Sequence, residues 1–216
     1  MKKFLAQVKQ LMEYYQTKRG EIRNRLREFE DILNQPDEKV FSELCFCICT
    51  PQSKATLCDE AIIALERRNL LLKGNTDQIR LLLRGVRFAD RKARYIVEAR
   101  ELFKRNGKIR IKERLRSFDN IYQLREWIAD NVKGMGLKES SHFLRNIGLG
   151  KNLAILDRHI LKNLKELGII GEEKNLTKKR YLSIESKMRT FAQEINMPIE
   201  ELDLLLWSKE TGRVFK

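Results

Sequence analysis

One short stretch of the chain decides its fold, and it reads Val132-Lys133-Gly134-Met135-Gly136-Leu137-Lys138. The segments on both sides carry apolar residues at helical spacing, so we predict a tight turn that joins two helices. Glycine is needed where the backbone takes a positive φ or approaches a ligand closely. The second helix would point the positive end of its dipole at the turn, where backbone N–H groups can bind a phosphate. The stretch therefore predicts a helical hairpin able to hold a nucleic-acid backbone, although such glycine pairs also occur in ordinary helical turns.

The charge of the chain favours a polyanionic partner. Its 216 residues include 44 Lys and Arg against 30 Asp and Glu, which gives a net charge of +14. A surplus of this size attracts nucleic acid through its field alone, although a basic surface without a specific partner would look the same. Because Lys133 adds charge beside the two glycines, we predict that Lys133, Gly134 and Gly136 contact DNA.

The composition is typical of a helical protein, because Leu, Glu, Lys and Arg are abundant and only three prolines occur. We expect helices near residues 3–34, 41–50, 54–68, 76–84, 90–106, 120–132, 137–147, 158–168, 177–195 and 198–209. We expect Gly20 to interrupt the first helix, Asp119 to cap the helix at 120–132, and Asn106-Gly107 to end the helix at 90–106. No strong strand pattern is present, so the predicted fold class is all-α.

Neither a membrane segment nor a metal site is predicted. No apolar run is long enough to cross a bilayer and no secretory signal is visible, so we expect a cytoplasmic protein without a membrane partner. Three of the four cysteines alternate between Cys45 and Cys49, and alternate residues do not share a helix face. We therefore expect buried free thiols, no iron–sulfur cluster, and no cofactor.

A lysine and an aspartate suggest chemistry. Lys138 falls in the first turn of the second hairpin helix, where a cation is unfavourable and the neutral amine is favoured. A neutral amine can attack a sugar C1′ and form a Schiff base. Asp157 is placed to cap the next helix, and a carboxylate held in that way can stabilise positive charge on the sugar or help to take the lysine proton. Taken singly, each residue would be an ordinary surface lysine or an ordinary cap.

These motifs resemble the helix-hairpin-helix DNA glycosylase superfamily, on residues 132–148 together with 154–159. The hairpin and the chain end, 207–216, resemble one branch closely, the archaeal-type 8-oxoguanine DNA glycosylase/AP lyases, and the likeness covers essentially the whole chain. The resemblance implies two helical lobes with the active site between them. Residues 52–147 would form the hairpin lobe, and residues 1–51 together with 148–216 the second lobe. It also implies that Lys138 is the Schiff-base nucleophile and Asp157 its acidic partner.

The same resemblance implies how a flipped base is held. Trp207 would stack on the base, and Phe88 would be the other stacking aromatic residue. The terminal carboxylate of Lys216 would accept a hydrogen bond from N7 of oxidised guanine, which carries a hydrogen that guanine lacks. Gln52 would enter the gap that the base leaves in the duplex. Without the resemblance, Trp207 and Phe88 could equally be core side chains, and Gln52 a loop cap.

We therefore predict a monomeric DNA-repair enzyme that acts on double-stranded DNA containing oxidised guanine. It would excise 8-oxoguanine through a lysine Schiff base and cleave the abasic site by β-elimination. A non-catalytic helix-hairpin-helix module would explain the charge and the glycines, but not the pairing of Lys138 with Asp157. A third hypothesis keeps the lyase chemistry but changes the lesion, to another oxidised base or a bare abasic site. His142 and His159 lie within the motifs and are expected to be structural.

Overall fold

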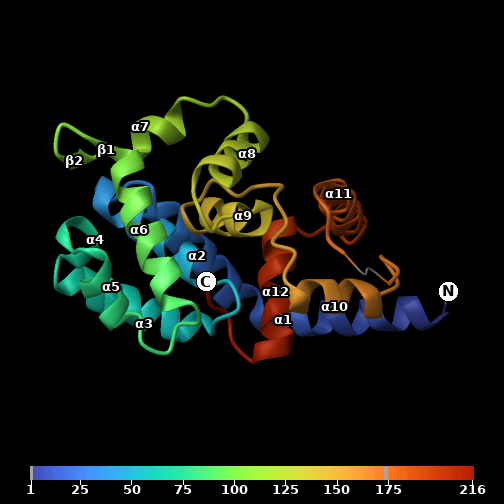
Figure 1. Cartoon of the computed structure of the whole chain (residues 1–216). Coiled ribbons are helices and arrows are strands. Elements are labelled where there is room, and N and C mark those ends of the chain that lie inside the picture. Colours follow the sequence, from blue (N-terminus) through green and yellow to red (C-terminus); the bar gives the residue numbers. More distant parts are fainter. Residues whose placement is uncertain (1, 173–174) are drawn as a thin grey trace.

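The computed structural model describes residues 2–172 and 175–216, and these are mostly helical (Figure 1). Its elements are α1 (Lys2–Ile32), α2 (Asp37–Cys49), α3 (Ala55–Arg67), α4 (Leu70–Lys73), α5 (Thr76–Leu82), α6 (Ala89–Phe103), β1 (Lys104–Arg105), β2 (Lys108–Ile109), α7 (Ile111–Arg116), α8 (Ile121–Asn131), α9 (Leu137–Asn146), α10 (Arg158–Glu166), α11 (Lys178–Glu194) and α12 (Ile199–Thr211). The all-α prediction is confirmed, and each expected helix is present.

The first helix continues through Gly20, so the expected interruption there is wrong. A glycine inside a helix costs only about 1 kcal/mol relative to alanine. Against that cost, α1 buries a row of side chains on the protein: Leu11, Tyr15, Ile22 and Phe29. Packing of one face contributes more to helix stability than local propensity does, so it outweighs the glycine.

Two further expectations are corrected by the connections around α6 and α8. Asn106 and Gly107 form the turn of the short β1–β2 hairpin with positive φ angles of 48° and 75°, so α6 ends earlier than expected. Asn-Gly favours this kind of turn because both of its residues tolerate positive φ. Asn120, and not Asp119, caps α8, since its side chain accepts hydrogen bonds from the N–H groups of Tyr122 and Gln123.

The four cysteines are buried free thiols, as expected. All four are free and buried, and burial raises the pKa of each thiol. Within residues 2–172 and 175–216, no group of His, Cys, Asp and Glu side chains is arranged to hold a metal ion. In the same part of the chain, every helix is too short or too polar to cross a bilayer.

The buried apolar side chains form two clusters, and the helices that carry them lie side by side (Figure 1). The first cluster draws on α2 to α9, and the second on α1, α10, α11 and α12. Every side chain from Val40 to Cys49 is buried, so α2 is an interior helix of the first cluster. Because α2 packs with the 52–147 segment, we propose that the hairpin lobe begins before α2 and not at residue 52.

The chain returns from α9 to α10 through a buried segment without helix or strand, residues 153–156, which we call the strap. Glu185 of α11 accepts a hydrogen bond from the Ala154 N–H at 2.8 Å, and the Tyr181 hydroxyl donates to the Ala154 carbonyl at 2.6 Å. Glu185 also forms a two-pronged ion pair with Arg125 of α8 at 2.5 and 3.0 Å. A single carboxylate therefore connects the strap and α11 to the helix before the hairpin.

This buried ion pair predicts a large stability effect. The Arg125 and Glu185 side chains are 1% and 3% exposed, so Glu185→Ala leaves a buried guanidinium without its counter-charge. We expect the free energy of unfolding in urea to fall by about 3–5 kcal/mol. The matched control is Glu13→Ala, which removes an exposed pair with Lys9 and is expected to change it by less than about 0.5 kcal/mol. Equal losses in the two variants would contradict the prediction.

Candidate active site

A cavity of about 780 Å³ opens where elements of both clusters meet. Five of the predicted site residues line it, namely Gln52, Lys138, Asp157, Trp207 and Lys216. Its volume lies within the usual range for small-molecule sites, about 300–1,000 Å³. The structure therefore brings the predicted nucleophile, its predicted acidic partner and three of the predicted DNA-contact residues to one place.

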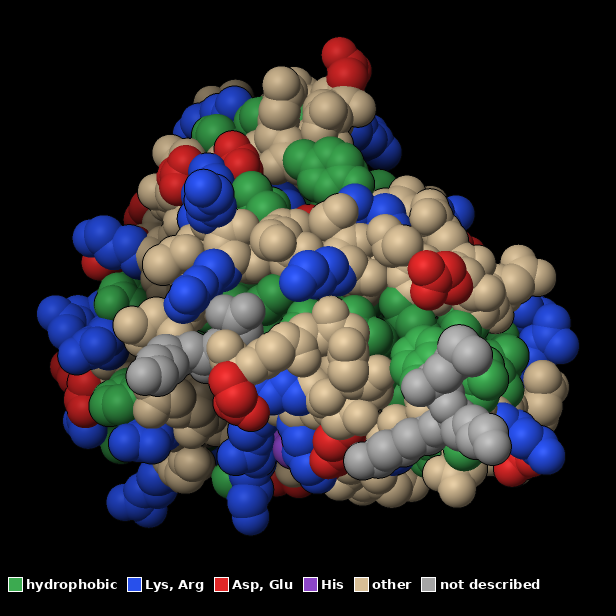
Figure 2. Space-filling model, turned by 90° about the vertical axis from the view of Figure 1, so that its right-hand side faces the viewer, with side chains coloured by type: hydrophobic (Ala, Val, Ile, Leu, Met, Phe, Trp, Pro, Cys, Tyr) green, Lys and Arg blue, Asp and Glu red, His purple; other side chains and the backbone are tan. Residues whose placement is uncertain are grey.

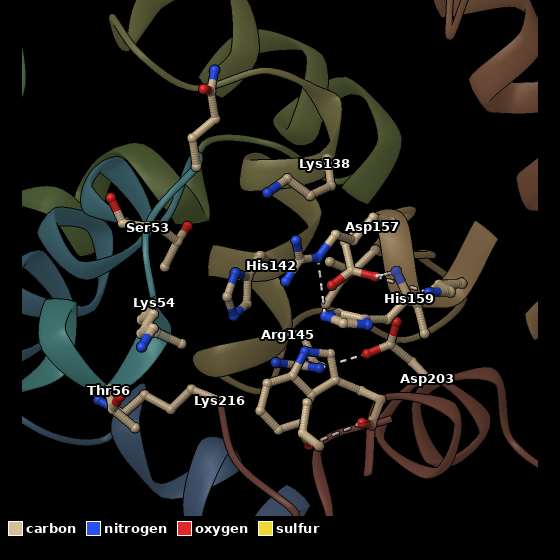
Figure 3. Close-up of a pocket in the computed structure, with 18 of the residues that line it drawn as sticks. Ser53, Lys54, Thr56, Lys138, His142, Arg145, Asp157, His159, Asp203 and Lys216 are labelled. Carbon is tan, nitrogen blue, oxygen red and sulfur yellow. Dashed lines mark hydrogen bonds and ion pairs between the residues drawn. The ribbon is translucent and has the colours of Figure 1, made fainter. Parts of the chain in front are cut away.

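Helix α9 supplies one wall of this cavity through a single face. Lys138, His142 and Arg145 are spaced so that they lie one above another on the helix, and all three line the cavity. In Figure 3 they come from the same helix, with Asp157 and Asp203 to one side and Ser53 to the other. The i, i+4, i+7 spacing was visible in the sequence and would have added Arg145 to the candidate site.

The carboxylate in direct contact with Lys138 is that of Glu139, at 2.8 Å from Nζ to Oε1. The other oxygen of Glu139 accepts a hydrogen bond from the Gly136 N–H at 3.2 Å, as in a capping box. Among the described residues, no ion pair joins Lys138 to Asp157. The sequence prediction missed Glu139, although a glutamate three residues after an N-cap position is a recognisable signal.

Asp157 caps α10, as predicted. Its Oδ1 accepts hydrogen bonds from the N–H groups of His159 and Ile160, each at 2.8 Å. These two bonds fix the orientation of the carboxylate, and the strap fixes the position of its backbone. The result is a rigid negative charge on the wall of the cavity, to one side of α9 (Figure 3).

A buried ion pair between Arg145 and Asp203 forms part of the wall, with 2.6 Å between Nη1 and Oδ2. Burial raises the pKa of Asp203 to about 7, and the charge of Asp157 acts in the same direction while Arg145 opposes it. The second oxygen, Oδ1, has no hydrogen-bond partner. Asp203 was missed, although an acidic residue within the apolar run 202–206 has to find a partner when it is buried.

His142 also faces the cavity instead of serving only the core. It packs edge-on against Phe46, with 5.7 Å between ring centroids, and its Nε2 atom has no hydrogen-bond partner. Burial is the main reason why its pKa lies well below the usual value, and the nearby charges of Arg145, Lys138 and Lys216 lower the pKa further. The imidazole is therefore neutral at neutral pH.

Two glycines in the hairpin were expected to need special backbone conformations, and one of them, Gly134, has a positive φ. Gly134 has φ of +85°, and an added Cβ atom would lie 2.6 Å from Cδ2 of Tyr95, so only glycine fits there. Gly136 has an ordinary φ of −108° and serves as the N-cap of α9. Lys133 is exposed and forms an ion pair with Glu98 at 3.0 Å. Contact of these three residues with DNA stays a prediction.

The end of the chain is anchored on the first cluster. The Lys216 ammonium forms ion pairs with Glu43 at 2.9 Å and Asp59 at 2.7 Å, and it lies over the Phe46 ring. The preceding residue, Phe215, stacks on Trp207 with 6.4 Å between ring centroids. The side chain of Lys216 therefore serves to hold the end of the chain against α2 and α3.

The structure does not bring Phe88 into the cavity. Its side chain is 44% exposed and is flanked by the guanidinium groups of Arg87 and Arg91, at 5.0 and 5.5 Å from the ring centroid. Arg87 itself lines the cavity. A stacking role for Phe88 stays a prediction, and it would require the residue to meet a base outside the cavity wall.

A glycine hairpin followed by a lysine shares a cavity with a helix-capping aspartate, as the resemblance to the helix-hairpin-helix DNA glycosylases implies. The family model described as 8-oxoguanine DNA glycosylase matches residues 22–197. The chain belongs to this family.

Named relatives agree with the family model over nearly the full length. The 8-oxoguanine DNA glycosylase/AP lyase of Fusobacterium nucleatum is 45% identical over 204 residues, which is 94% of each chain. The crystal structure of the Methanocaldococcus jannaschii 8-oxoguanine glycosylase/lyase in complex with a 15mer DNA containing 8-oxoguanine matches with a TM-score of 0.88, at 35% identity, covering 98% of this chain and 100% of that one. The 8-oxoguanine DNA glycosylase of Thermotoga maritima matches with a TM-score of 0.87, at 31% identity, covering 99% and 100%.

The depressed pKa of His142 predicts a pH-dependent stability. Below about pH 6.5 the unfolded histidine takes up a proton that the buried imidazole refuses, so stability is lost as the pH falls. We expect His142→Gln to remove a slope of up to about 1.4 kcal/mol per pH unit from urea unfolding between about pH 6.5 and 5. The control is His159→Gln, which replaces the other, partly exposed histidine. An unchanged slope in His142→Gln would contradict this account.

Proposed function

We propose that this chain acts as the names of its relatives indicate, as an 8-oxoguanine DNA glycosylase/AP lyase. It removes 8-oxoguanine from double-stranded DNA and cleaves the strand at the resulting abasic site. The observation that carries the proposal is the position of Lys138, in the first turn of α9 and on the wall of a cavity that it shares with Asp157. Family membership favours this enzyme over a non-catalytic DNA-binding module. We place its activity in the cytoplasm, on chromosomal DNA.

The reaction uses the Lys138 nitrogen as the nucleophile. It forms a bond to C1′ of the deoxyribose as the bond between C1′ and the base breaks, and the base leaves with the electron pair and a proton. The C1′–O4′ bond then opens and O4′ takes a proton, which leaves a Schiff base between C1′ and the lysine. Loss of a proton from C2′ expels the 3′ phosphate oxygen, and this β-elimination cleaves the strand.

The two carboxylates near the nucleophile have separate tasks in this proposal. Glu139 is in direct contact with the Lys138 ammonium, so it is the group placed to help free the amine of its proton. Asp157 is held by backbone N–H groups and stabilises the positive charge that develops on the sugar as the base departs. A carboxylate fixed before the reaction needs no reorganisation during it.

The cavity also supplies contacts for the extruded base. We assign Trp207 to stack on the base and the terminal carboxylate of Lys216 to accept a hydrogen bond from N7 of 8-oxoguanine. The ion pairs of the Lys216 side chain with Glu43 and Asp59 support this role, because they hold the last residue at the cavity wall. Phe88 is assigned to a second stacking contact on the opened duplex.

The DNA backbone is held outside the cavity. We assign Lys133, Gly134 and Gly136 to a phosphate and Gln52 to the gap in the duplex. The net charge of +14 draws DNA to the surface. On the face shown in Figure 2, Lys and Arg side chains are scattered over the surface with Asp and Glu among them, so the attraction on that face is spread out and not gathered in one patch.

The nucleophile is tested by trapping the Schiff base with borohydride on duplex DNA that contains 8-oxoguanine. Lys138→Gln should abolish the covalent complex, because the amide cannot form the bond to C1′. The control is Lys9→Gln, which replaces a highly exposed lysine of α1 and should trap as the parent protein does. A Lys138→Gln protein that traps as well as the parent would refute the assignment.

The terminal carboxylate is tested by deleting Lys216. Excision of 8-oxoguanine should fall by about 10- to 100-fold, which is the loss of one charge-assisted hydrogen bond, while cleavage of a preformed abasic site persists. Lys216→Met is the matched variant, because it removes the ion pairs with Glu43 and Asp59 but keeps a carboxylate at position 216. Undiminished excision by the deletion variant would show that the tail has no recognition role.

A further inference from the structure

Lys92 is a buried lysine that the proposed chemistry does not use. It lies in α6, and only 4% of the residue is exposed. Its ammonium donates hydrogen bonds to the carbonyl of Cys49 at 2.6 Å, the carbonyl of Pro51 at 2.7 Å and the Ser53 hydroxyl oxygen at 3.0 Å. An ammonium has three protons to donate, so the three acceptors satisfy it fully. One buried charge thus organises the end of α2 and the loop after it.

Ser53 extends this organisation to a second loop. Its hydroxyl oxygen also accepts a hydrogen bond from the backbone N–H of Arg87 at 2.9 Å. The loop between α2 and α3 is therefore tied to the loop that precedes α6, at one oxygen atom. We call Lys92 and Ser53 together the joint. Ser53 lies at the edge of the cavity, across from Lys138 (Figure 3).

A residue with an unfavourable backbone lies beside the joint in each loop. Gln52, next to Ser53, has φ of +56°, and Phe88, next to Arg87, has φ of +61°. This left-handed conformation is strained for a residue with a side chain, and it persists only where the surroundings enforce it. The hydrogen bonds of the joint fall on the neighbours of both residues, so they are placed to enforce it.

We propose that Lys92 and Ser53 position Gln52 and Phe88 as one unit that opens duplex DNA. The inference rests on the proposed function, in which Gln52 enters the gap in the duplex and Phe88 stacks on it. Because the Ser53 hydroxyl joins the two loops, the backbones that carry Gln52 and Phe88 hold a fixed relative position when DNA arrives. Lys92 and Ser53 are positioning residues, since the atoms that react belong to Lys138 and the sugar.

If the joint has this role, the effect of loosening it on the excision rate should depend on whether the lesion is base-paired. Extruding a base costs most where it is fully paired and least where it has no partner. Loosening the joint should therefore slow excision of a paired lesion and spare an unpaired lesion. A general loss of stability, by contrast, would slow both reactions by the same factor.

The test compares single-turnover excision of 8-oxoguanine opposite cytosine with excision opposite a stable abasic-site analogue. Ser53→Ala removes the shared acceptor, and we expect about tenfold slower excision from the paired duplex, with a change within about twofold on the unpaired lesion. Ser53→Thr keeps the hydroxyl and should restore the paired rate. The matched control is Ser117→Ala, whose hydroxyl donates to the Arg114 carbonyl at the end of α7.

Lys92→Met provides a second variant, with urea unfolding to show whether it is folded. If Lys92→Met is folded, it should also excise the paired lesion more slowly and the unpaired lesion at nearly the parent rate. If it is not folded, the Ser53 variants alone test the proposal. If Ser53→Ala slowed excision equally on both duplexes, or did not slow it at all, the positioning role of the joint would be overturned. The proposed function would be left intact. A parent protein that neither excises 8-oxoguanine nor forms a borohydride adduct would overturn the proposed function itself.

Discussion

The catalytic arrangement depends on how the strap, residues 153–156, is held. Lys138 and Asp157 belong to helices of different clusters, and the strap carries the chain from one to the other. Its Ala154 is bonded through both backbone groups to α11, where Glu185 is in turn paired with Arg125 of α8. These contacts are buried, so losing one partner leaves the other without water to replace it. The position of Asp157 is therefore as rigid as the core on which the strap lies.

The charges around the cavity are arranged so that one carboxylate remains available. Three of the cations that line the cavity each contact an acid: Lys138 with Glu139, Arg145 with Asp203, and Lys216 with Glu43. Asp157 instead accepts hydrogen bonds from backbone N–H groups, and no ion pair to it is formed within residues 2–172 and 175–216. A fixed acid without a cationic partner is suited to stabilise positive charge on a sugar. This difference separates the proposed role of Asp157 from those of its acidic neighbours.

Much of this site could be predicted because it rests on local patterns. The Gly134 turn and the cap at Asp157 follow from a few adjacent residues, and the helices follow from apolar periodicity. Features set by packing were missed: α1 passes through Gly20 because its apolar face is buried, and Asp203 enters the cavity because α12 packs beneath it. The position of Phe88 outside the cavity likewise depends on a loop conformation that no local pattern specifies.

The claim that matters most is that one particular amine forms the covalent bond to DNA. Mass spectrometry of the borohydride-reduced complex, digested with nuclease and trypsin, would read that position directly. The account predicts that the deoxyribose adduct lies on Lys138, within the peptide spanning residues 134–145, because the modified lysine resists cleavage. An adduct on Lys92, Lys216 or any other amine, with Lys138 unmodified, would contradict it.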